Sequence, residues 1–540
     1  MFRLFRNFSL VNIRLHKRIT LNSTCHKIFD KNPPFKRSIC NVGKLHIPKE
    51  INTSHRNYFT WGANGHFEDT IYALSSGMGK AGVAVIRVSG PGASKCINKL
   101  TKSFNPLKDI TTALPPSRKA VFRKIVHPTT GETLDHGIIV WFPGPNSFTG
   151  EDIVEFQVHG GNAVVKGILS ALGQLEDYRP AERGEFARRA FENDKLDLTE
   201  VEGLADLLNA ETEVQRRLAL RQAGGALKGL YENWRSGMIK NLALVEAIID
   251  FGEDENIEDG IYNQVHDAIS SMYLSITEHM NDNRRGEILR EGIHIAILGL
   301  PNAGKSSFLN RIAQRDVAIV SHIPGTTRDV VETTLNIGGY PVVLGDTAGL
   351  RDTDNLIEAE GVSRAKKRIQ QADIKICIVD VAALVKHEAI FDLDKLLGPI
   401  VINEVDKNTI LLLNKSDEVE NSAAIQQLRE IITKRLGSSF IWDISCKTGK
   451  GIDGFLKGFT EILESSYGTM VAESPLITQA RHRVHLEDCI DALERFLGQE
   501  DIVLGAEDLR HATNAMGRIT GRIDVEEVLD VIFQEFCIGK

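Results

Sequence analysis

The sequence predicts a multidomain protein with an α+β domain at its N-terminus and an α/β domain inserted into an all-α helical domain. The chain has 540 residues, enough for three or four domains of roughly 150 residues each. Short strand-like runs mix with helical stretches up to residue 178, whereas strands and helices alternate from residue 291 to 468. Helix-forming segments precede and follow the alternating region, and this order predicts the insertion.

Composition places the chain among globular proteins. Hydrophobic residues make up 42% and charged residues 25%, which excludes a disordered or collagen-like chain. No apolar run reaches the roughly 18 residues of a transmembrane helix, so no membrane span is predicted. The seven cysteines form no C-x-x-C pair, which argues against structural zinc and against a disulfide framework.

Charge is distributed unevenly along the chain. The net charge is −8, but residues 1–60 carry 12 Lys and Arg against Asp30 and Glu50, so the remaining residues carry −18. An Arg-rich, acid-poor and partly amphipathic N-terminus is typical of a mitochondrial transit peptide, and a disordered basic arm that binds RNA is the alternative. The acidic remainder excludes a basic surface over the whole chain, so any RNA contact must use a local patch.

The predicted elements divide the rest of the chain. Residues 61–178 are expected to form the α+β domain, with strands at 82–90, 136–142 and 152–158 and helices at 92–102 and 162–175. Residues 179–290 and 469–540 are expected to form the helical domain around the inserted residues 291–468. Apolar residues at three- and four-residue spacing predict its helices at 205–210, 218–223, 234–251, 481–497 and 525–536, and the acidic run 252–260 predicts a solvated loop.

A phosphate-binding loop is predicted at the start of the inserted domain. The run Gly299-Leu-Pro-Asn-Ala-Gly-Lys-Ser306 follows an apolar strand and precedes a helix. In this setting backbone N–H groups and the helix N-terminus hold a polyphosphate. Lys305 is expected on the β- and γ-phosphates, and Ser306 is expected to ligate Mg²⁺. The predicted nucleotide-binding residues of the loop are Asn302, Ala303, Gly304, Lys305, Ser306 and Ser307.

Three further motifs follow predicted strands in the order of a Ras-like GTPase. The first, Asp346-Thr347-Ala348-Gly349, is expected beside Mg²⁺ and the γ-phosphate. In the second, Asn414-Lys415-Ser-Asp417, the Asp417 carboxylate can accept two hydrogen bonds from guanine that adenine cannot offer. The third, Ser445-Cys446-Lys447, matches the last guanine-contact loop. The inserted domain is therefore predicted to be an α/β P-loop GTPase domain that binds GTP.

The residues predicted to promote GTP hydrolysis differ from those of Ras-like enzymes. Thr326 and Thr327 lie where the first switch is expected, and Thr327 is a candidate second ligand of Mg²⁺. Leu350 stands where Ras-like enzymes keep a water-orienting Gln, so another group must replace it. Asn302 could offer an oxygen to a K⁺ ion beside the phosphates. Glu358 could align the attacking water, and a solvated surface carboxylate is the alternative for this residue.

From about Asp69 to Lys540 the chain resembles the MnmE (TrmE) family of tRNA-modifying GTPases, in its mitochondrial form. The resemblance rests on the nucleotide motifs, on residues 81–90, 147–155 and 183–198, and on the C-terminal Cys537-Ile-Gly-Lys540. It implies an N-terminal folate-binding domain that forms a homodimer, a helical domain, and a K⁺-dependent GTPase.

The resemblance also implies roles for particular residues by motif position. Glu358 would be the catalytic carboxylate, and K⁺ would be surrounded by Asn302, Ser321, Ile323 and Thr326. Formyl- or methylene-tetrahydrofolate would be contacted by Arg87, Glu155, Lys195 and Lys540. Cys537 is a candidate catalytic thiolate for the one-carbon unit, and a small buried hydrophobic residue is the alternative.

By the same resemblance, the protein would act with a flavin-dependent MnmG-type partner in the mitochondrial matrix. It would modify carbon 5 of the wobble uridine of mitochondrial tRNAs, giving a carboxymethylaminomethyl or taurinomethyl group. A mitochondrial ribosome-assembly GTPase without base chemistry, and a scaffold that binds nucleotide without turnover, are the alternatives. The motifs themselves predict GTP hydrolysis, whereas the uridine chemistry is implied by the resemblance alone.

Overall fold

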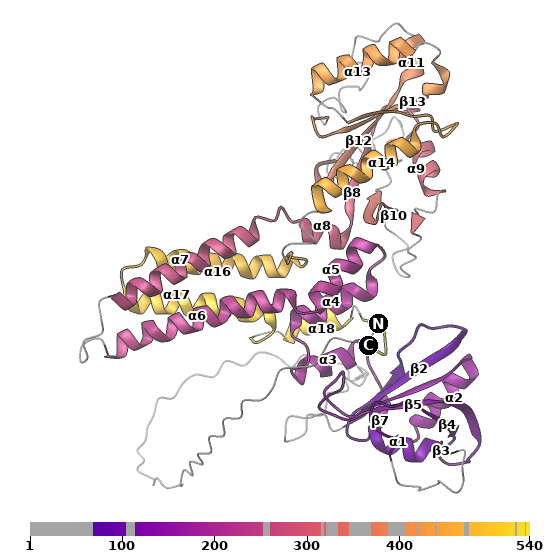
Figure 1. The fold of residues 1–540 in the computed structure, drawn as a ribbon, viewed down its shortest axis with the longest axis vertical. Coiled ribbons are helices and arrows are strands. Elements are labelled where there is room, and N and C mark those ends of the chain that lie inside the picture. Colours follow the sequence, from indigo (N-terminus) through magenta and orange to yellow (C-terminus); the bar gives the residue numbers. More distant parts are fainter. Residues whose placement is uncertain are drawn as a thin grey trace, which may run out of the picture. The chain divides into compact units, whose positions relative to one another are not determined.

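The computed structural model of the protein describes residues 69–103, 114–251, 260–314, 318–319, 333–344, 369–386, 405–419, 422–437, 440–468, 475–523, 526–534 and 536–540. These residues form an N-terminal sheet domain, a set of long helices and a second sheet domain, coloured along the chain in Figure 1. None of the helices in these ranges is long and apolar enough to cross a membrane.

The N-terminal domain is built on a seven-stranded sheet in the order β3-β4-β5-β6-β2-β1-β7. Its strands are β1 (Thr70–Leu74), β2 (Ala81–Ser89), β3 (Thr101–Lys102), β4 (Val121–Val126), β5 (Thr133–Phe142), β6 (Ile153–Gly160) and β7 (Tyr178–Pro180). Neighbours are antiparallel except β1 and β7, which are parallel.

Two helices cover one face of this sheet. Helices α1 (Ala93–Leu100) and α2 (Asn162–Leu172) bury their apolar residues against inward-facing side chains such as Ile86 and Phe156. Because side chains alternate along a strand, the neighbours of these residues, including Arg87 and Glu155, point to the open face. The predicted strands correspond to β2, β5 and β6. The helix predicted to reach residue 102 ends at Leu100, and Thr101 turns extended and starts β3.

The helical domain is formed by segments that precede and follow the inserted domain in the sequence, as predicted. Its helices are α3 (Glu185–Glu192), α4 (Leu198–Asn209), α5 (Glu213–Ala223), α6 (Ala226–Phe251), α7 (Gly260–Met280), α8 (Arg285–Glu291), α16 (Ala480–Gly498), α17 (Ile502–Thr520) and α18 (Glu526–Gln534). One buried cluster joins Tyr231 and Ile269 from before the insertion to Leu493 and Met516 from after it. Residues 252–259 of the predicted acidic loop lie outside the described residues.

The inserted domain is a doubly wound α/β fold. Its sheet has the order β14-β13-β12-β8-β11-β10-β9, parallel from β14 to β11 and antiparallel at β10 and β9. The strands are β8 (Ile293–Leu298), β9 (Ala318–Ile319), β10 (Thr333–Ile337), β11 (Tyr340–Leu344), β12 (Ile374–Asp380), β13 (Ile410–Asn414) and β14 (Ile441–Asp443).

Helices cover both faces of this sheet. The helices and shorter turns are α9 (Lys305–Ala313), α11 (Val381–Lys386), η2 (Ser416–Glu418), α13 (Ser422–Leu436), α14 (Ile452–Leu463) and η3 (Glu464–Gly468). Phe308 of α9 and Phe455 of α14 share one core, and Leu428 of α13 belongs to a second core on the opposite face. Open parallel sheets of this kind bind ligands outside the carboxyl ends of their strands.

Candidate functional sites

A cavity of about 610 Å³ lies at the carboxyl ends of β8 and β13 in the inserted domain. Three loops meet there although the first is separated by 111 residues from the second, which is separated by 32 residues from the third. The lining residues are Asn302, Gly304, Lys305, Ser306, Ser307, Asn414, Lys415, Asp417, Glu418, Cys446 and Lys447. All of these except Glu418 were predicted to bind nucleotide from the motifs, and the structure brings them together.

The buried side chain of Asn414 connects these loops. Its Nδ2 atom donates to the backbone oxygen of Ala303 at 2.8 Å, and its Oδ1 atom accepts from the backbone N–H of Cys446 at 3.1 Å. Gly304 has φ +103°, and a Cβ atom there would lie 2.1 Å from Asn414 Nδ2. Only glycine therefore allows this close approach, and the phosphate-binding loop and the last guanine-contact loop depend on the same amide.

Lys305 and Ser306 stand at the N-terminus of α9, inside the cavity. The Lys305 ammonium donates to the backbone oxygens of Gly299 at 2.7 Å and Leu300 at 2.9 Å. Burial lowers the pKa of Lys305. An anionic polyphosphate would give this ammonium charged partners in place of neutral carbonyl groups, and the free N–H groups of the helix terminus add to the attraction.

Asp417 lies in the short turn η2, exposed at the cavity wall. A side-chain hydrogen bond with Ser445 lowers the pKa of Asp417. The carboxylate is therefore ionised at neutral pH and can accept the paired N–H groups of guanine. Lys415 has a positive φ of 62° and forms an ion pair with Asp380 at the end of β12, which fixes the motif on the sheet edge.

Of the other residues considered for this site, Ala303 and Ser445 lie in the loops just described, and the rest lie outside the described residues. They are Ser321, Ile323, Thr326, Thr327, Asp346, Thr347, Ala348, Gly349, Leu350 and Glu358. The switch, the γ-phosphate contacts and the catalytic carboxylate therefore stay predictions.

A second group of charged side chains lies on the open face of the N-terminal sheet. Arg87 and Glu155 face each other across β2 and β6, and the guanidinium donates to Glu155 Oε1 at 3.0 and 3.1 Å. Both side chains are mostly buried, with exposed fractions of 15% and 18%. The Arg87 guanidinium also lies over the rings of Phe148, at 5.3 Å, and Phe186, at 5.7 Å.

The C-terminus of the chain reaches this pair. Ile538 forms a β-bridge with Arg183, and Ser75 Oγ donates to the backbone oxygen of Gly539 at 2.8 Å. Gly539 has φ +102°, and a Cβ atom there would lie 2.1 Å from the backbone oxygen of Leu74, so the tail sits tightly on the end of β1. Burial and the neighbouring Arg87 charge lower the pKa of Lys540, against an opposing effect of Glu155.

Lys195 and Cys537, the other residues predicted for this site, make no contact with the Arg87–Glu155 pair among the contacts described above. Lys195 lies beside the loop at Gly150, because a Cβ atom added to Gly150 would lie 3.2 Å from Lys195 Cε. The neighbouring Asn193 donates to the backbone oxygen of Thr149 at 2.7 Å, which ties this segment to the same loop. Cys537 is exposed, so it is not the buried hydrophobic residue that was the alternative reading.

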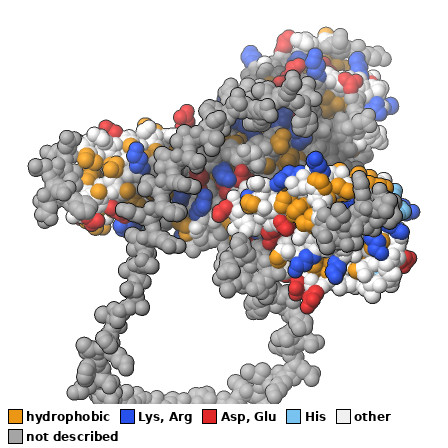
Figure 2. All heavy atoms as spheres, turned by 60° about the horizontal axis from the view of Figure 1, so that its bottom comes forward, with side chains coloured by type: hydrophobic (Ala, Val, Ile, Leu, Met, Phe, Trp, Pro, Cys, Tyr) orange, Lys and Arg blue, Asp and Glu red, His pale blue; other side chains and the backbone are white. Residues whose placement is uncertain are grey.

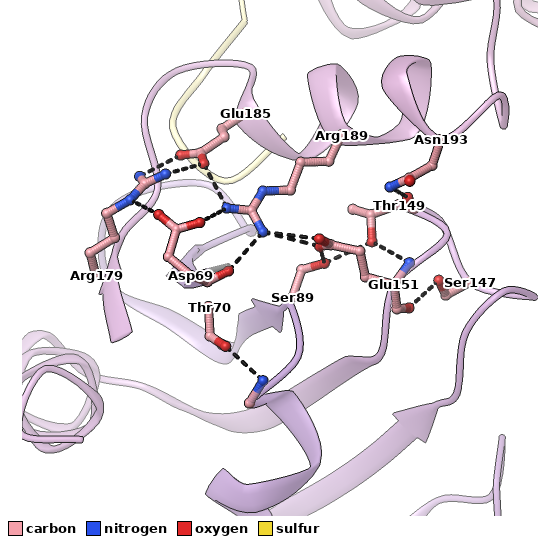
Figure 3. A network of polar contacts seen from close by, with 11 residues as sticks. Asp69, Thr70, Ser89, Ser147, Thr149, Glu151, Arg179, Glu185, Arg189 and Asn193 are labelled. Atoms are coloured by element: carbon pink, nitrogen blue, oxygen red, sulfur yellow. Dashed lines mark hydrogen bonds and ion pairs between the residues drawn. The ribbon is translucent and has the colours of Figure 1, made fainter. Parts of the chain in front are cut away.

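A buried guanidinium supports the segments around Arg87. Arg189 of α3 is fully buried, and Figure 3 shows its contacts. It donates to Asp69 Oδ1 at 2.8 Å, to Glu185 Oε1 at 3.0 Å, and to both oxygens of Glu151 at 3.1 and 3.2 Å. Arg179 adds a second cation that contacts Asp69 and Glu185. Two guanidinium groups are thus shared among three carboxylates.

This network fixes the loop that precedes β6. Ser89 Oγ donates to Glu151 Oε2 at 2.7 Å and shares a 2.7 Å hydrogen bond with Thr149 Oγ1. Burial raises the pKa of Glu151, against the opposing effects of Arg189 and Ser89. Phe148 belongs to this loop and Phe186 to α3, so the network holds both rings beside Arg87. Sequence reasoning missed the network because nothing in the charge pattern marks Arg189 as buried.

The sequence comparisons cover most of the chain. A family profile described as the GTP-binding protein TrmE N-terminus matches residues 70–195, and one described as the MnmE helical domain matches residues 198–537. The chain is 48% identical over 480 residues to the mitochondrial 5-taurinomethyluridine-[tRNA] synthase subunit GTPB3 of Danio rerio, covering 88% of this chain and 93% of the relative. It is 45% identical over 475 residues to the tRNA modification GTPase MnmE of Paramagnetospirillum magneticum, covering 87% and 100%.

Removing the Arg189 guanidinium should destabilise the N-terminal domain. Arg189→Met leaves Glu151 without its cation and leaves Asp69 and Glu185 with Arg179 alone, and breaking a buried ion pair in this way costs about 3–5 kcal/mol of unfolding free energy. Arg216→Met is the control, because it removes an exposed helix pair with Glu213 that is worth about 1 kcal/mol or less. Differential scanning calorimetry of the full chain compares the two. Equal transition temperatures for both variants would contradict the supporting role of Arg189.

Proposed function

The chain belongs to the MnmE (TrmE) family of tRNA-modification GTPases, and on this basis we propose that it hydrolyses GTP to drive modification of carbon 5 of the wobble uridine in mitochondrial tRNAs. The added group would be of the carboxymethylaminomethyl or taurinomethyl type, formed with a flavin-dependent MnmG-type partner. The observation that supports the proposal is that one chain holds both a guanine-nucleotide cavity around Asn414 and the charged cluster of Arg87, Glu155 and Lys540.

Leu350 stands at the position where Ras-like enzymes keep a water-orienting Gln, and a potassium ion would take over part of its role. Asn302 lines the nucleotide cavity and has φ +61°, so its amide belongs to the wall beside Lys305. An amide oxygen is a ligand that K⁺ accepts in place of water, and Ser321, Ile323 and Thr326 would complete the shell. Ser306 would ligate Mg²⁺ together with Thr327, and Glu358 would align the attacking water. The positive charge near the phosphates stabilises the charge that develops during hydrolysis.

The chemistry of the N-terminal cluster fits a reduced folate. A carboxylate such as Glu155 accepts hydrogen bonds from ring N–H groups, and ammonium and guanidinium groups pair with carboxylates. Arg87, Glu155, Lys195 and Lys540 would hold formyl- or methylene-tetrahydrofolate, while Phe148 and Phe186 offer apolar walls near Arg87. The folate would supply the one-carbon unit, and the exposed thiol of Cys537 lies on the same C-terminal tail.

The N-terminal domain would also form the homodimer. Phe122 and Ile138 are directly opposite each other on β4 and β5, with exposed fractions of 59% and 36%. Figure 2 shows hydrophobic side chains gathered on the surface of this domain. Exposed apolar patches of this kind mark association surfaces, and a second copy of the chain is the occupant that we propose. The Arg-rich segment 1–60 would direct the protein to the mitochondrial matrix.

Mass spectrometry of mitochondrial tRNA nucleosides tests the proposed function. Cells that lack the chain should lose the C5-modified wobble uridine, and the wild-type chain should restore it. A Lys305→Ala chain should not restore it, because the γ-phosphate contact is lost. An unchanged level of the modified nucleoside in the deletion would contradict the proposal.

The dependence of GTP turnover on K⁺ tests the proposed role of Asn302. Asn302→Gly removes the amide and tolerates the positive φ, so GTP turnover should no longer be faster in K⁺ than in Na⁺. Initial rates in the two salts, with GTP affinity measured in parallel, give the result. A K⁺ stimulation that survives the substitution would contradict the role of Asn302.

A further inference from the structure

One short region of the chain is strongly basic. Residues 91–126 contain eight Lys or Arg and a single acid, Asp109, in a chain whose residues after position 60 carry −18. Two of these lysines, Lys102 and Lys124, lie on β3 and β4 at the outer edge of the N-terminal sheet, and two more, Lys95 and Lys99, lie on α1, which covers the opposite face of the sheet. We refer to these four lysines as the basic strip.

The basic strip contains two pairs of like charges held close by regular structure. Lys102 and Lys124 are directly opposite each other on β3 and β4, and His136 of β5 follows in the same row. Side chains in such positions are about 5 Å apart at Cβ, and like charges there are destabilising. Lys95 and Lys99 are exposed and lie one turn apart on α1, where like charges also repel.

Among the described residues, no acid lies within ion-pair distance of these lysines. The four lysines form no ion pair there, whereas many other cations of the domain do. Asp135, the acid of β5, is already hydrogen-bonded to the backbone N–H and the ring of His159. Lys102 and Lys124 therefore present two positive charges without a described ion pair at the sheet edge, which an external polyanion would neutralise.

The row of Lys102, Lys124 and His136 lies on the same sheet face as the proposed folate site. His136, Ile138 and Val140 alternate along β5 and share one face. Val140 is paired with Glu155, which is paired with Arg87. The four residue steps from His136 to Val140 span about 14 Å. The Phe122–Ile138 pair of the proposed dimer surface lies between them. RNA bound to the row would therefore reach the Arg87–Glu155 pair from the margin of that surface.

We propose that the basic strip binds the phosphate backbone of the substrate tRNA and so brings the target nucleotide to the folate site. This proposal rests on the proposed function, because it assumes a tRNA substrate. Contacts between lysines and phosphates position an RNA without reading its sequence, and they supply a salt-dependent affinity. Figure 2 shows Lys and Arg side chains beside the hydrophobic ones on the surface of this domain.

The test uses the full chain and an unmodified tRNA transcript. Lys102→Gln with Lys124→Gln removes two charges and relieves the like-charge pair, so the transition temperature should not fall. The affinity for the transcript should drop about tenfold, and the slope of log K against log salt should fall by about 2, one for each phosphate contact. Fluorescence anisotropy at several salt concentrations gives both values.

A matched control separates the strip from general charge. Lys166→Gln with Lys457→Gln removes two exposed lysines of α2 and α14, and the affinity and slope should stay those of the wild type. Equal binding by the strip variant and this control would overturn the proposal. An intact tRNA affinity together with a lost complex with the flavin-dependent partner would also overturn it, because the strip would then bind a protein. A wild-type chain that does not bind tRNA would instead contradict the proposed function.

Discussion

The buried guanidinium of Arg189 is the interaction on which the N-terminal site depends. It joins the start of β1 at Asp69, the loop that carries Glu151, and α3 at Glu185. A buried charge is costly unless it is paired with opposite charges and hydrogen-bonded, so these three segments are stabilised together. Arg87 lies beside two of them, through Phe148 and Phe186. The position of the Arg87–Glu155 pair therefore follows from a fully buried charge outside that pair.

In the nucleotide cavity, a buried neutral side chain joins separate segments in a similar way. The Asn414 amide bonds to the phosphate-binding loop on one side and to the last guanine-contact loop on the other. Its two hydrogen bonds are possible because Gly304 has no side chain. In both sites one buried polar group joins segments that are remote in sequence, and each site can be rigid although it is built largely from loops. Preorganised polar groups of this kind cost no rearrangement when a ligand binds.

Sequence reasoning predicted the parts of this molecule that have a local signal. The strands β2, β5 and β6, the insertion of the α/β domain and the residues around Lys305 follow from apolar runs and a spaced motif. Helix α17 was not predicted, because Gly505 and Gly517 lower its helix propensity, and its stability comes from burial of Leu509, Met516 and Ile519. Arg87 and Lys540 carry no local signal either. Their meeting depends on the fit of Gly539 on β1, which only the folded chain reveals.

The proposed folate site, to which the N-terminal domain and the C-terminal Lys540 would both contribute, can be tested directly. Isothermal titration of the full chain with 5-formyltetrahydrofolate should show binding that weakens at least about tenfold in Lys540→Met, the cost of losing one charge-assisted hydrogen bond. Lys457→Met, on the exposed surface of α14, should bind like the wild type. Equal affinity in Lys540→Met and the wild type, or no binding by the wild type, would show that the C-terminus does not complete a folate site.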